Sequence, residues 1–306
     1  MSKVLVATQK PFSPSAAQHI QNILTKAGHE IEFLEHYGSE LDLKKAIADI
    51  DAIIIRSDIV NTSLLNEAKQ LKVIVRAGAG YDNVDLAAAT KRNVVVMNTP
   101  GQNSNAVAEL VIGLLIYGFR NFFQPGTGRE IHGKKLGLQA FGNVGKLVAK
   151  QAQALGMYVY AYDPFLDEKI LNEMKVTPVK NLSQLYSQCD VVSLHIPALP
   201  KTIGSIDYKL CSKLPPDGIL INTARKEIIN ESDLEMLLRN RPDLRYLCDV
   251  KPDNYDLLVA NFPAQIFATP KKMGAETEEA NSKAATAAAQ LVADFLATGD
   301  APFKVN

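Results

Sequence analysis

The stretch from Lys134 to Phe165, KKLGLQAFGNVGKLVAKQAQALGMYVYAYDPF, constrains the fold of this chain more than any other part. The apolar start, Lys135 to Phe141, predicts a strand, and apolar positions then recur at helical spacing up to Gly156. A second β-rich run, Met157 to Tyr162, leads into Asp163. This order of strand, glycine turn, helix, strand and carboxylate predicts a dinucleotide-binding βαβ unit, with an ordinary βα turn of another α/β fold as the alternative.

The turn of this unit has residues that suit a bound pyrophosphate. Gly142 would let the main chain approach the phosphates, and Gly145 would let the helix pack closely on the strand. The phosphates would lie at the helix N-terminus, where free N–H groups and the helix dipole favour negative charge. Ala140 replaces the first glycine of the G-x-G-x-x-G pattern, and we expect it to make the turn with a negative φ.

Asp163 indicates which dinucleotide binds. A carboxylate at this distance from the turn accepts hydrogen bonds from the adenosine ribose hydroxyls and repels a 2′-phosphate. Pro164 and Phe165 follow it, where a phosphate-binding arginine would otherwise stand. The sequence therefore favours NAD over NADP.

Length and composition limit the class of protein. The chain has 306 residues, 47% of them hydrophobic, which is enough for two domains with separate cores. Its 33 basic residues balance its 33 acidic ones, so neither nucleic acid nor an anionic membrane is an expected partner. No apolar run reaches the roughly 18 residues that span a bilayer, and the N-terminus leads directly into a strand, which predicts a cytoplasmic protein. The three cysteines, Cys189, Cys211 and Cys248, are too widely spaced for a disulfide framework or a zinc site, so we expect buried thiols and no metal.

The first hundred residues alternate between strand and helix patterns, which predicts a small parallel sheet with helices on both faces. The expected strands are 3–7, 31–34, 52–55, 73–75 and 94–97, and the expected helices are 13–27, 41–50 and 64–69. Ligands bind beyond the carboxyl ends of such strands. There the sequence has Arg56 and Ser57 after one strand, and Arg76 before Gly78, Ala79 and Gly80 after another. Arginines and exposed backbone N–H groups suit a carboxylate or phosphate, although a surface ion pair is the alternative for either arginine.

The second half continues the same alternation. The expected strands are 191–194, 219–221, 246–247 and 266–268, and each is followed by polar residues that should gather at one edge of a second sheet. The helix 106–119 is apolar nearly all round, so it should be buried or lie in a subunit contact. The helix 278–298 should return to the first domain. We therefore predict an α/β protein with two doubly wound parallel sheets, a Rossmann-like NAD-binding domain (104–277) and a flavodoxin-like substrate-binding domain built from both chain ends (1–103 and 278–306).

Six segments resemble the D-2-hydroxyacid dehydrogenase family, most closely its phosphoglycerate dehydrogenase branch. They are VRAGAGYDNVDL, VVMNTPGQNSNAVAEL, LGLQAFGNVG, VSLHIPA, INTARKE and TPKKMGAETEEA. The resemblance implies an NAD-dependent oxidation of 3-phospho-D-glycerate to 3-phosphohydroxypyruvate, the first step of serine biosynthesis. It also implies a homodimer formed through the cofactor domains, in a short form without the serine-sensing regulatory domain. The residues that it places at the cofactor are Ala140, Gly142, Asn143, Val144, Gly145, Asp163, His195, Pro197, Thr223, Ala224, Asp249 and Gly274.

The resemblance also implies catalytic roles, and here the chain departs from the family. Arg225 occupies the position of the arginine that binds the substrate carboxylate and polarises the carbonyl. The family has a histidine after Thr-Pro, paired with a glutamate, and neither residue is present. Lys271 takes the histidine position when counted from Pro270, and Lys272 takes it when counted back from Gly274; we favour Lys272.

Asn254 stands at the position of the missing glutamate. A carboxylate would raise the pKa of a lysine further above its ordinary value of about 10.4, so its loss is consistent with a lysine that acts as a base. We expect burial of the amine and the neighbouring Arg225 and Lys271 to lower the pKa of Lys272. The alternative is that both lysines only bind phosphate or carboxylate.

Two other functions are compatible with the sequence. One is a glyoxylate or hydroxypyruvate reductase, and the other is a catalytically silent NAD-binding scaffold, because a fold alone does not prove an activity. We interpret His195 as a histidine on the cofactor side, or a structural one, and not as the base that replaces the missing histidine.

Overall fold

The computed structural model describes all residues, 1–306, and divides them into two compact units, one of residues 1–103 and 276–306 and one of residues 104–275. The boundaries expected from the sequence were 103/104 and 277/278. We call the two units unit 1 and unit 2, in this order.

Unit 1 has one parallel sheet of five strands. They are β1 (Lys3–Thr8), β2 (Glu30–Glu35), β3 (Ala52–Ile55), β4 (Val73–Arg76) and β5 (Val95–Asn98), in the order β2-β1-β3-β4-β5. Its helices are α1 (Pro14–Lys26), α2 (Glu40–Ala46), α3 (Thr62–Glu67), α4 (Leu86–Lys91) and α12 (Glu278–Thr298). The strand order is that of flavodoxin-like sheets, which confirms the predicted fold of this unit.

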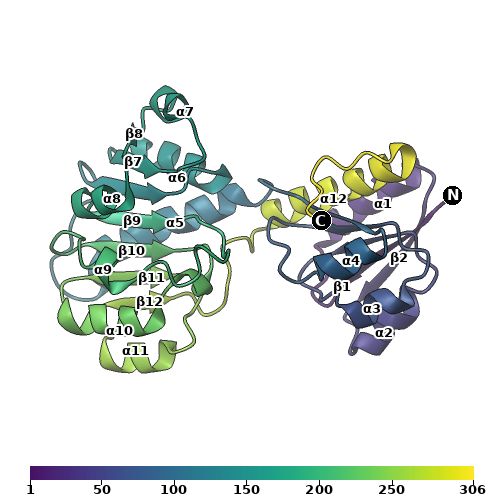
Figure 1. The fold of residues 1–306 in the computed structure, drawn as a ribbon, viewed down its shortest axis with the longest axis horizontal. Coiled ribbons are helices and arrows are strands. Elements are labelled where there is room, and N and C mark those ends of the chain that lie inside the picture. Colours follow the sequence, from purple (N-terminus) through teal and green to yellow (C-terminus); the bar gives the residue numbers. More distant parts are fainter. The chain divides into compact units, whose positions relative to one another are not determined.

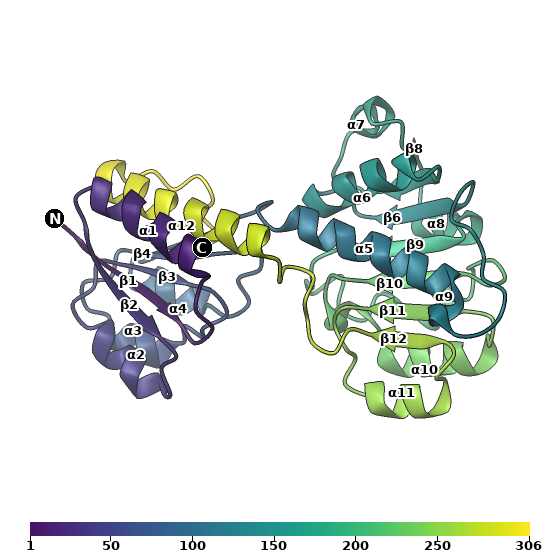
Figure 2. The ribbon, with the colours of Figure 1, turned by 180° about the vertical axis from the view of Figure 1, so that it is seen from behind.

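The two faces of this sheet follow from the alternation of side chains along each strand. In β1, Val4 and Val6 pack with α1 and α12, whereas Leu5 and Ala7 pack with α2, α3 and α4. Figures 1 and 2 show α1 and α12, from opposite ends of the chain, side by side on one face of the sheet. The chain end then pairs with the edge strand β5, where Val305 N donates to Val96 O at 2.9 Å. The predicted return of the C-terminal segment to the first domain is confirmed.

Unit 2 has one parallel sheet of seven strands. They are β6 (Lys135–Gln139), β7 (Tyr158–Tyr162), β8 (Thr177–Pro178), β9 (Val191–Leu194), β10 (Ile219–Asn222), β11 (Arg245–Cys248) and β12 (Ile266–Ala268). The helices are α5 (Ser104–Phe119), α6 (Asn143–Ala154), α7 (Glu168–Glu173), α8 (Leu182–Gln188), α9 (Tyr208–Cys211), α10 (Glu231–Asn240) and α11 (Tyr255–Asn261), with short 3₁₀ turns η1 (Asn121–Phe123) and η2 (Lys226–Ile228). The order β12-β11-β10-β9-β6-β7-β8 reverses at β6, which is the arrangement of a Rossmann sheet and confirms that prediction.

Two apolar cores sandwich this second sheet. One core joins α5 and α6 to one face, and the other joins α8, α9, α10 and α11 to the opposite face. In Figure 2, α5 and α6 lie on the near side of the sheet. The three cysteines are buried and unpaired within the second core, as expected from their spacing. None of the helices in the structure is both long enough and apolar enough to cross a bilayer.

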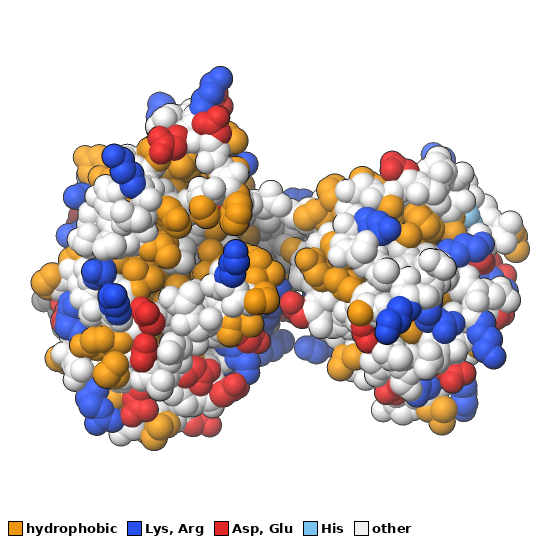
Figure 3. All heavy atoms as spheres, in the orientation of Figure 1, with side chains coloured by type: hydrophobic (Ala, Val, Ile, Leu, Met, Phe, Trp, Pro, Cys, Tyr) orange, Lys and Arg blue, Asp and Glu red, His pale blue; other side chains and the backbone are white.

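Charged side chains are mixed on the molecular surface. On the face drawn in Figure 3, basic and acidic side chains are interspersed over both units. This pattern agrees with the balance of 33 basic and 33 acidic residues.

Candidate dinucleotide site and substrate loops

The turn between β6 and α6 is tighter than the sequence suggests. The expectation of a negative φ at Ala140 is wrong, because its φ is 78°. Ala140 N still donates to Tyr162 O at 2.9 Å, so pairing with β7 continues to the last residue before the turn. The chain must then enter α6 within two residues, and the left-handed conformation makes this reversal possible.

Gly145 lies directly against this turn. A Cβ atom on Gly145 would stand 2.7 Å from Ala140 O, a distance that real Cβ atoms do not reach. Any other residue would push α6 away from the end of β6. The role of Gly145 in close helix–strand packing therefore follows from the backbone itself.

The N-terminus of α6 is open to an anion. Gly142 is its N-cap, no side chain accepts a hydrogen bond from its first turn, and a Cβ on Gly142 would meet nothing within 4 Å. Asn143 and Val144 begin the helix, so their N–H groups are among the donors without an intrahelical partner. An open, glycine-capped helix end of twelve residues fits a pyrophosphate.

Asp163 connects the end of β7 to the glycine turn. Its carboxylate accepts hydrogen bonds from Phe141 N at 2.9 Å and from Phe165 N at 3.0 Å. A carboxylate offers about four acceptor positions, so two remain for ribose hydroxyls. This second, structural use of Asp163 was not predicted from the sequence.

Two buried polar atoms lie at the ends of the next strands. His195 follows β9 and Thr223 follows β10, and neither His195 Nε2 nor Thr223 Oγ1 has a hydrogen-bond partner. Buried polar atoms without hydrogen-bond partners are rare, and a polar ligand would supply the missing partners. The His195 ring also lies beside Gly145, with Cδ2 at 3.8 Å from the position of a Cβ there.

Burial lowers the pKa of His195 to about 4. The imidazole is therefore neutral near pH 7 and is a weak base there, since an efficient general base has a pKa close to the working pH. The interpretation of His195 as a residue of the cofactor side rests on its place beside Gly145. Pro197 follows in the same loop and is exposed.

Asn222, whose role was not predicted from the sequence, shapes the loop that carries Arg225. Its side chain is fully buried, donates to Arg225 O at 2.9 Å and accepts from Ala224 N at 3.0 Å. Arg225 itself is half-buried, and its Nη1 donates to Ala224 O at 2.9 Å. An amide at the last position of a buried strand is the signal that could have identified Asn222.

The segment that carries both lysines is attached to Asp249. The Asp249 carboxylate, which follows β11, accepts hydrogen bonds from Thr269 Oγ1 at 2.7 Å and from Met273 N and Gly274 N at 2.8 Å each. Lys271 and Lys272 lie between these anchors, and both side chains are exposed. The expectation that Lys272 is buried is therefore wrong for the structure of this unit, because residues 270–273 form an exposed loop after β12.

The neighbourhood of Asn254 agrees with the loss of a carboxylate partner. Asn254 is half-buried, and its Oδ1 has no hydrogen-bond partner. The adjacent Asp253 forms an ion pair with Lys226. Glu231 is also occupied, because it accepts hydrogen bonds from Asp253 N and Asn254 N.

In unit 1 the two arginines lie at neighbouring strand ends. Arg56 follows β3 and donates to Lys10 O and Pro11 O at 3.2 Å each and to Asn281 Oδ1 at 2.6 Å. It also lies 3.6 Å from a Glu276 carboxylate oxygen, and 14% of its side chain is exposed. Much of its hydrogen-bonding capacity is therefore used within unit 1.

Arg76, the last residue of β4, lies over the glycine-rich loop. Its Nε donates to Arg56 O at 2.9 Å, and its Nη1 lies 1.5 Å from where a Cβ on Gly78 would be. Gly78 also has a φ of 146°, so only glycine suits this position. Ala79 O accepts from Asn98 Nδ2 at 2.6 Å, whereas Ser57, next to Arg56, is exposed. Gly80, half-buried, completes the loop.

Asp58 and Asn83 organise these loops, a role that was not predicted from the sequence. Asp58 is buried and accepts from Gln9 N, Tyr37 Oη and Arg56 N at 2.8, 2.6 and 3.2 Å. Asn83 Nδ2 donates to Arg56 O and Asp58 O. An acid two residues after a strand-end arginine is a signal that could have identified Asp58.

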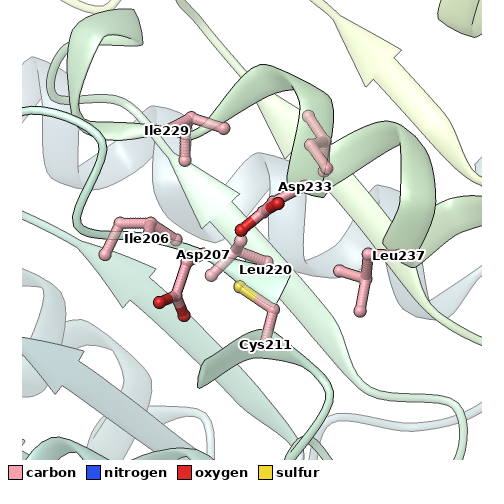
Figure 4. A pocket seen from close by; sticks show the side chains of 8 residues that line it. Ile206, Asp207, Cys211, Leu220, Ile229, Asp233 and Leu237 are labelled. Atoms are coloured by element: carbon pink, nitrogen blue, oxygen red, sulfur yellow. The ribbon is translucent and has the colours of Figure 1, made fainter. Parts of the chain in front are cut away.

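The pocket in Figure 4 lies elsewhere in unit 2. Its lining is Ile206, Asp207, Cys211, Leu220, Ile229, Asp233, Leu234 and Leu237. Both carboxylates are used by the backbone, since Asp207 accepts from Leu210 N and Asp233 from Tyr208 N. Burial raises the pKa of the Cys211 thiol, which makes it unreactive. This pocket is a feature of packing and not a ligand site.

The Rossmann sheet, its glycine turn and the strand-end residues define a dinucleotide-binding protein with a second, flavodoxin-like unit. The chain belongs to the D-isomer specific 2-hydroxyacid dehydrogenase family, whose catalytic-domain model matches residues 4–306. A solved relative is the cofactor(NAD+)-bound 3-phosphoglycerate dehydrogenase of Entamoeba histolytica. It is 45% identical, with a TM-score of 0.93, over 100% of this chain and 98% of that one.

Curated relatives carry two names. The D-3-phosphoglycerate dehydrogenase of Methanocaldococcus jannaschii is 32% identical over 305 residues, which are 90% of this chain and 57% of the relative. The hydroxypyruvate reductase of Thermotoga maritima is 33% identical over 250 residues, which are 76% of this chain and 78% of the relative. The chain thus spans little more than half the length of the curated phosphoglycerate dehydrogenases that it matches.

Proposed function

We propose that this chain is an NAD-dependent D-2-hydroxyacid dehydrogenase that oxidises 3-phospho-D-glycerate to 3-phosphohydroxypyruvate, the first step of serine biosynthesis. The observation that carries the proposal is the convergence of residues at one sheet edge: the open turn at α6, Asp163, Arg225 and the lysine segment all follow strands of the same parallel sheet. The names of the E. histolytica and M. jannaschii relatives support the substrate.

The residues of unit 2 bind different parts of the dinucleotide. The first turn of α6 binds the pyrophosphate, Asp163 accepts from the ribose hydroxyls, and Asn143, Val144, His195, Pro197, Thr223, Ala224 and Gly274 surround the dinucleotide. NAD held by these residues would supply the acceptor for the hydride of C2 of the hydroxy acid. The Asp163 carboxylate disfavours the 2′-phosphate of NADP.

Arg225 and a lysine act on the reacting end of the substrate. The guanidinium of Arg225 pairs with the substrate carboxylate and stabilises the charge that develops on the carbonyl oxygen. Lys272 in its neutral form takes the hydroxyl proton while the C2–H bond breaks, and the lysine segment places Lys271 next to it. The phosphate of the substrate is bound by Arg56, Ser57 and Arg76 together with the N–H groups of Gly78, Ala79 and Gly80.

We further propose a homodimer formed through unit 2. Helix α5 is apolar over most of its surface yet leaves Ile116 38% exposed, and the turn that follows leaves Phe123 67% exposed. Large apolar side chains in this position suit a subunit contact.

A second function, hydroxypyruvate reduction without a phosphate, is supported by one observation. Arg56 already donates three hydrogen bonds within unit 1, which limits what it offers to a phosphate. The T. maritima relative has the corresponding name.

One assay separates these functions. NADH absorbance is followed with 3-phosphohydroxypyruvate, hydroxypyruvate, glyoxylate and pyruvate in turn. A kcat/KM that is highest for the phosphorylated acid supports the proposal, and equal or greater values for hydroxypyruvate support the second function. Binding of NADH without turnover of any of the four acids would mean a catalytically silent scaffold.

A further inference from the structure

A buried carboxylate lies two residues after the arginine that ends β3. Arg56, Ser57 and Asp58 follow this strand directly, and we call them the arginine loop. Asp58 is 5% exposed, and its carboxylate accepts hydrogen bonds from Gln9 N at 2.8 Å, Tyr37 Oη at 2.6 Å and Arg56 N at 3.2 Å. These donors follow β1, β2 and β3, so one side chain joins the ends of three strands.

The carbonyl groups of the arginine loop are also bound. Asn83 Nδ2 donates to Arg56 O at 3.3 Å and to Asp58 O at 2.7 Å, and Arg76 Nε donates to Arg56 O at 2.9 Å. Ser57, between these two residues, is exposed. The backbone on both sides of Ser57 is therefore fixed to unit 1.

Asp58 also reaches the guanidinium of Arg56 through a second segment. Arg56 Nη1 donates to Lys10 O and Pro11 O at 3.2 Å each, and these residues follow Gln9, whose N–H binds Asp58. The carboxylate thus holds the backbone of Arg56 at one end and the segment that carries its acceptors at the other. An arginine that is held in this way loses little freedom when a ligand binds.

We infer that Asp58 is the positioning residue of the arginine loop, and that it sets the affinity of unit 1 for the phosphate of the substrate. Hydrogen bonds to an ionised carboxylate are about twice as strong as neutral ones, so three of them suit a residue that keeps a binding loop in place. The inference rests on the proposed function, in which Arg56 and Ser57 bind this phosphate.

A comparison of two acids tests this role. Tyr37→Phe removes only the hydroxyl that donates to Asp58 and changes no charge, whereas Asp58→Asn replaces one acceptor oxygen with an N–H₂ group. Each change should raise KM for 3-phosphohydroxypyruvate about fivefold, because the phosphate must then order the loop as it binds. The kcat for this acid and the KM for hydroxypyruvate, which has no phosphate, should stay within twofold of the wild type.

Trypsin tests the loop without any assay of activity. Only 14% of the Arg56 side chain is exposed, so the bond between Arg56 and Ser57 is cleaved only when the loop leaves its anchors. Mass spectrometry of the fragment that begins at Ser57 follows this cleavage. Tyr37→Phe and Asp58→Asn should each raise its rate about fivefold, the effect of one net hydrogen bond.

Two matched variants control both measurements. Tyr158→Phe makes the same chemical change at a tyrosine of β7 that is 63% exposed. Thr298→Val removes a hydroxyl that donates to Asp294 O in α12, and so weakens unit 1 at another place. Neither change should alter cleavage after Arg56 or the KM for 3-phosphohydroxypyruvate.

Three results would overturn the inference. The first is a Tyr37→Phe enzyme with both the cleavage rate and the KM of the wild type. The second is an equal rise in KM for the two acids, which would mean general damage. The third is a lower KM of Asp58→Asn for the phosphorylated acid, which would mean that the carboxylate acts on the phosphate by its charge and not through the loop.

The loop and the proposed substrate can fail separately. If the wild type does not favour the phosphorylated acid, the proposed substrate is wrong, and cleavage after Arg56 still decides whether Asp58 holds the loop. If Asp58→Asn does not fold, Tyr37→Phe decides the same question.

Discussion

Because a lysine stands in place of the family's histidine, the enzyme must keep the side chain of Lys272 neutral for it to act as a base. Replacement of Lys272 by Met removes the titratable group and keeps most of the apolar stem. We predict that kcat falls at least about a hundredfold, the usual contribution of a general base, whereas the Kd for NADH stays within threefold. Steady-state kinetics and NADH fluorescence measure the two quantities.

Lys271→Met is the matched control, since it removes the same charge one residue earlier. It should raise KM more than it lowers kcat, because in our assignment Lys271 contributes charge and not proton transfer. A Lys272→Met enzyme that retains most of its kcat would move the base to another residue.

The backbone at Ala140 offers a second prediction on the scale of one residue. A left-handed conformation costs a non-glycine residue about 1–2 kcal/mol, and the extra freedom of glycine in the unfolded chain offsets about 0.4–1 kcal/mol of any gain. Ala140→Gly should therefore stabilise the protein by roughly 0.5–1 kcal/mol, measured as the free energy of unfolding in urea.

Ala154→Gly is the contrasting substitution. Ala154 is the exposed last residue of α6 and is helical, so glycine there should destabilise by up to about 1 kcal/mol. If Ala140→Gly also destabilised, the left-handed turn would not exist in solution.

His195 makes the free energy of unfolding depend on pH, and the direction of this dependence follows from its pKa. Its pKa is about 4 in the folded protein, below the 6.5 of an ordinary histidine, so the unfolded chain binds the additional proton as the pH falls from 6.5 to 4. This residue should therefore make the protein less stable as the pH falls through that window, with a slope of at most about 1.4 kcal/mol per pH unit. In His195→Asn, urea unfolding between pH 7 and pH 4.5 should show a smaller loss; an unchanged loss would mean that His195 titrates normally.

At the scale of elements, the sequence predicted long elements better than short ones. The bounds of α12 were predicted to the residue, and the structure shows Thr277 as its N-cap and Gly299, with a left-handed φ of 77°, as its C-cap. Helices α4 and α9 were not predicted. They have six and four residues, too few for a periodic pattern, and each depends on one N-cap, Asp85 or Asp207.

The candidate site was also predicted only in part. Strand-end positions followed from the sheet pattern, so Asp163, Arg225 and Asp249 were assigned to one edge from the sequence. The hydrogen bonds from Met273 and Gly274 to Asp249 could not be predicted, because they depend on how two neighbouring loops fold against each other. The exposure of Lys272 was missed for the same reason.

Helix α5 allows a test of the proposed dimer. A glutamate in place of Ile116 would put two buried carboxylates into a two-fold symmetric contact, and burying an unpaired charge is strongly unfavourable. We predict that Ile116→Glu raises the dimer dissociation constant at least about a hundredfold, as measured by light scattering across a dilution series. Leu257→Glu, on the 52% exposed Leu257 of α11, should leave the dissociation constant unchanged; equal effects of both changes would argue against α5 as the contact.

At the scale of the whole molecule, the chain forms two units with separate cores and passes between them twice, at residues 103–104 and 275–276. The residues that we assign to the cofactor all belong to unit 2. A ligand that binds one folded unit stabilises that unit by RT ln(1 + [L]/Kd), about 2.7 kcal/mol at a hundred times Kd. With NADH at this concentration, the slowest amides of β6 and β7 should therefore exchange about a hundredfold more slowly, whereas those of β1 and β3 should change little. Hydrogen exchange with mass spectrometry measures both sheets in one experiment, and Asp163→Ala, which weakens the cofactor site, is the control. Equal slowing in both sheets would mean that the two cores unfold together, so that cofactor binding in unit 2 also stabilises the arginine loops of unit 1.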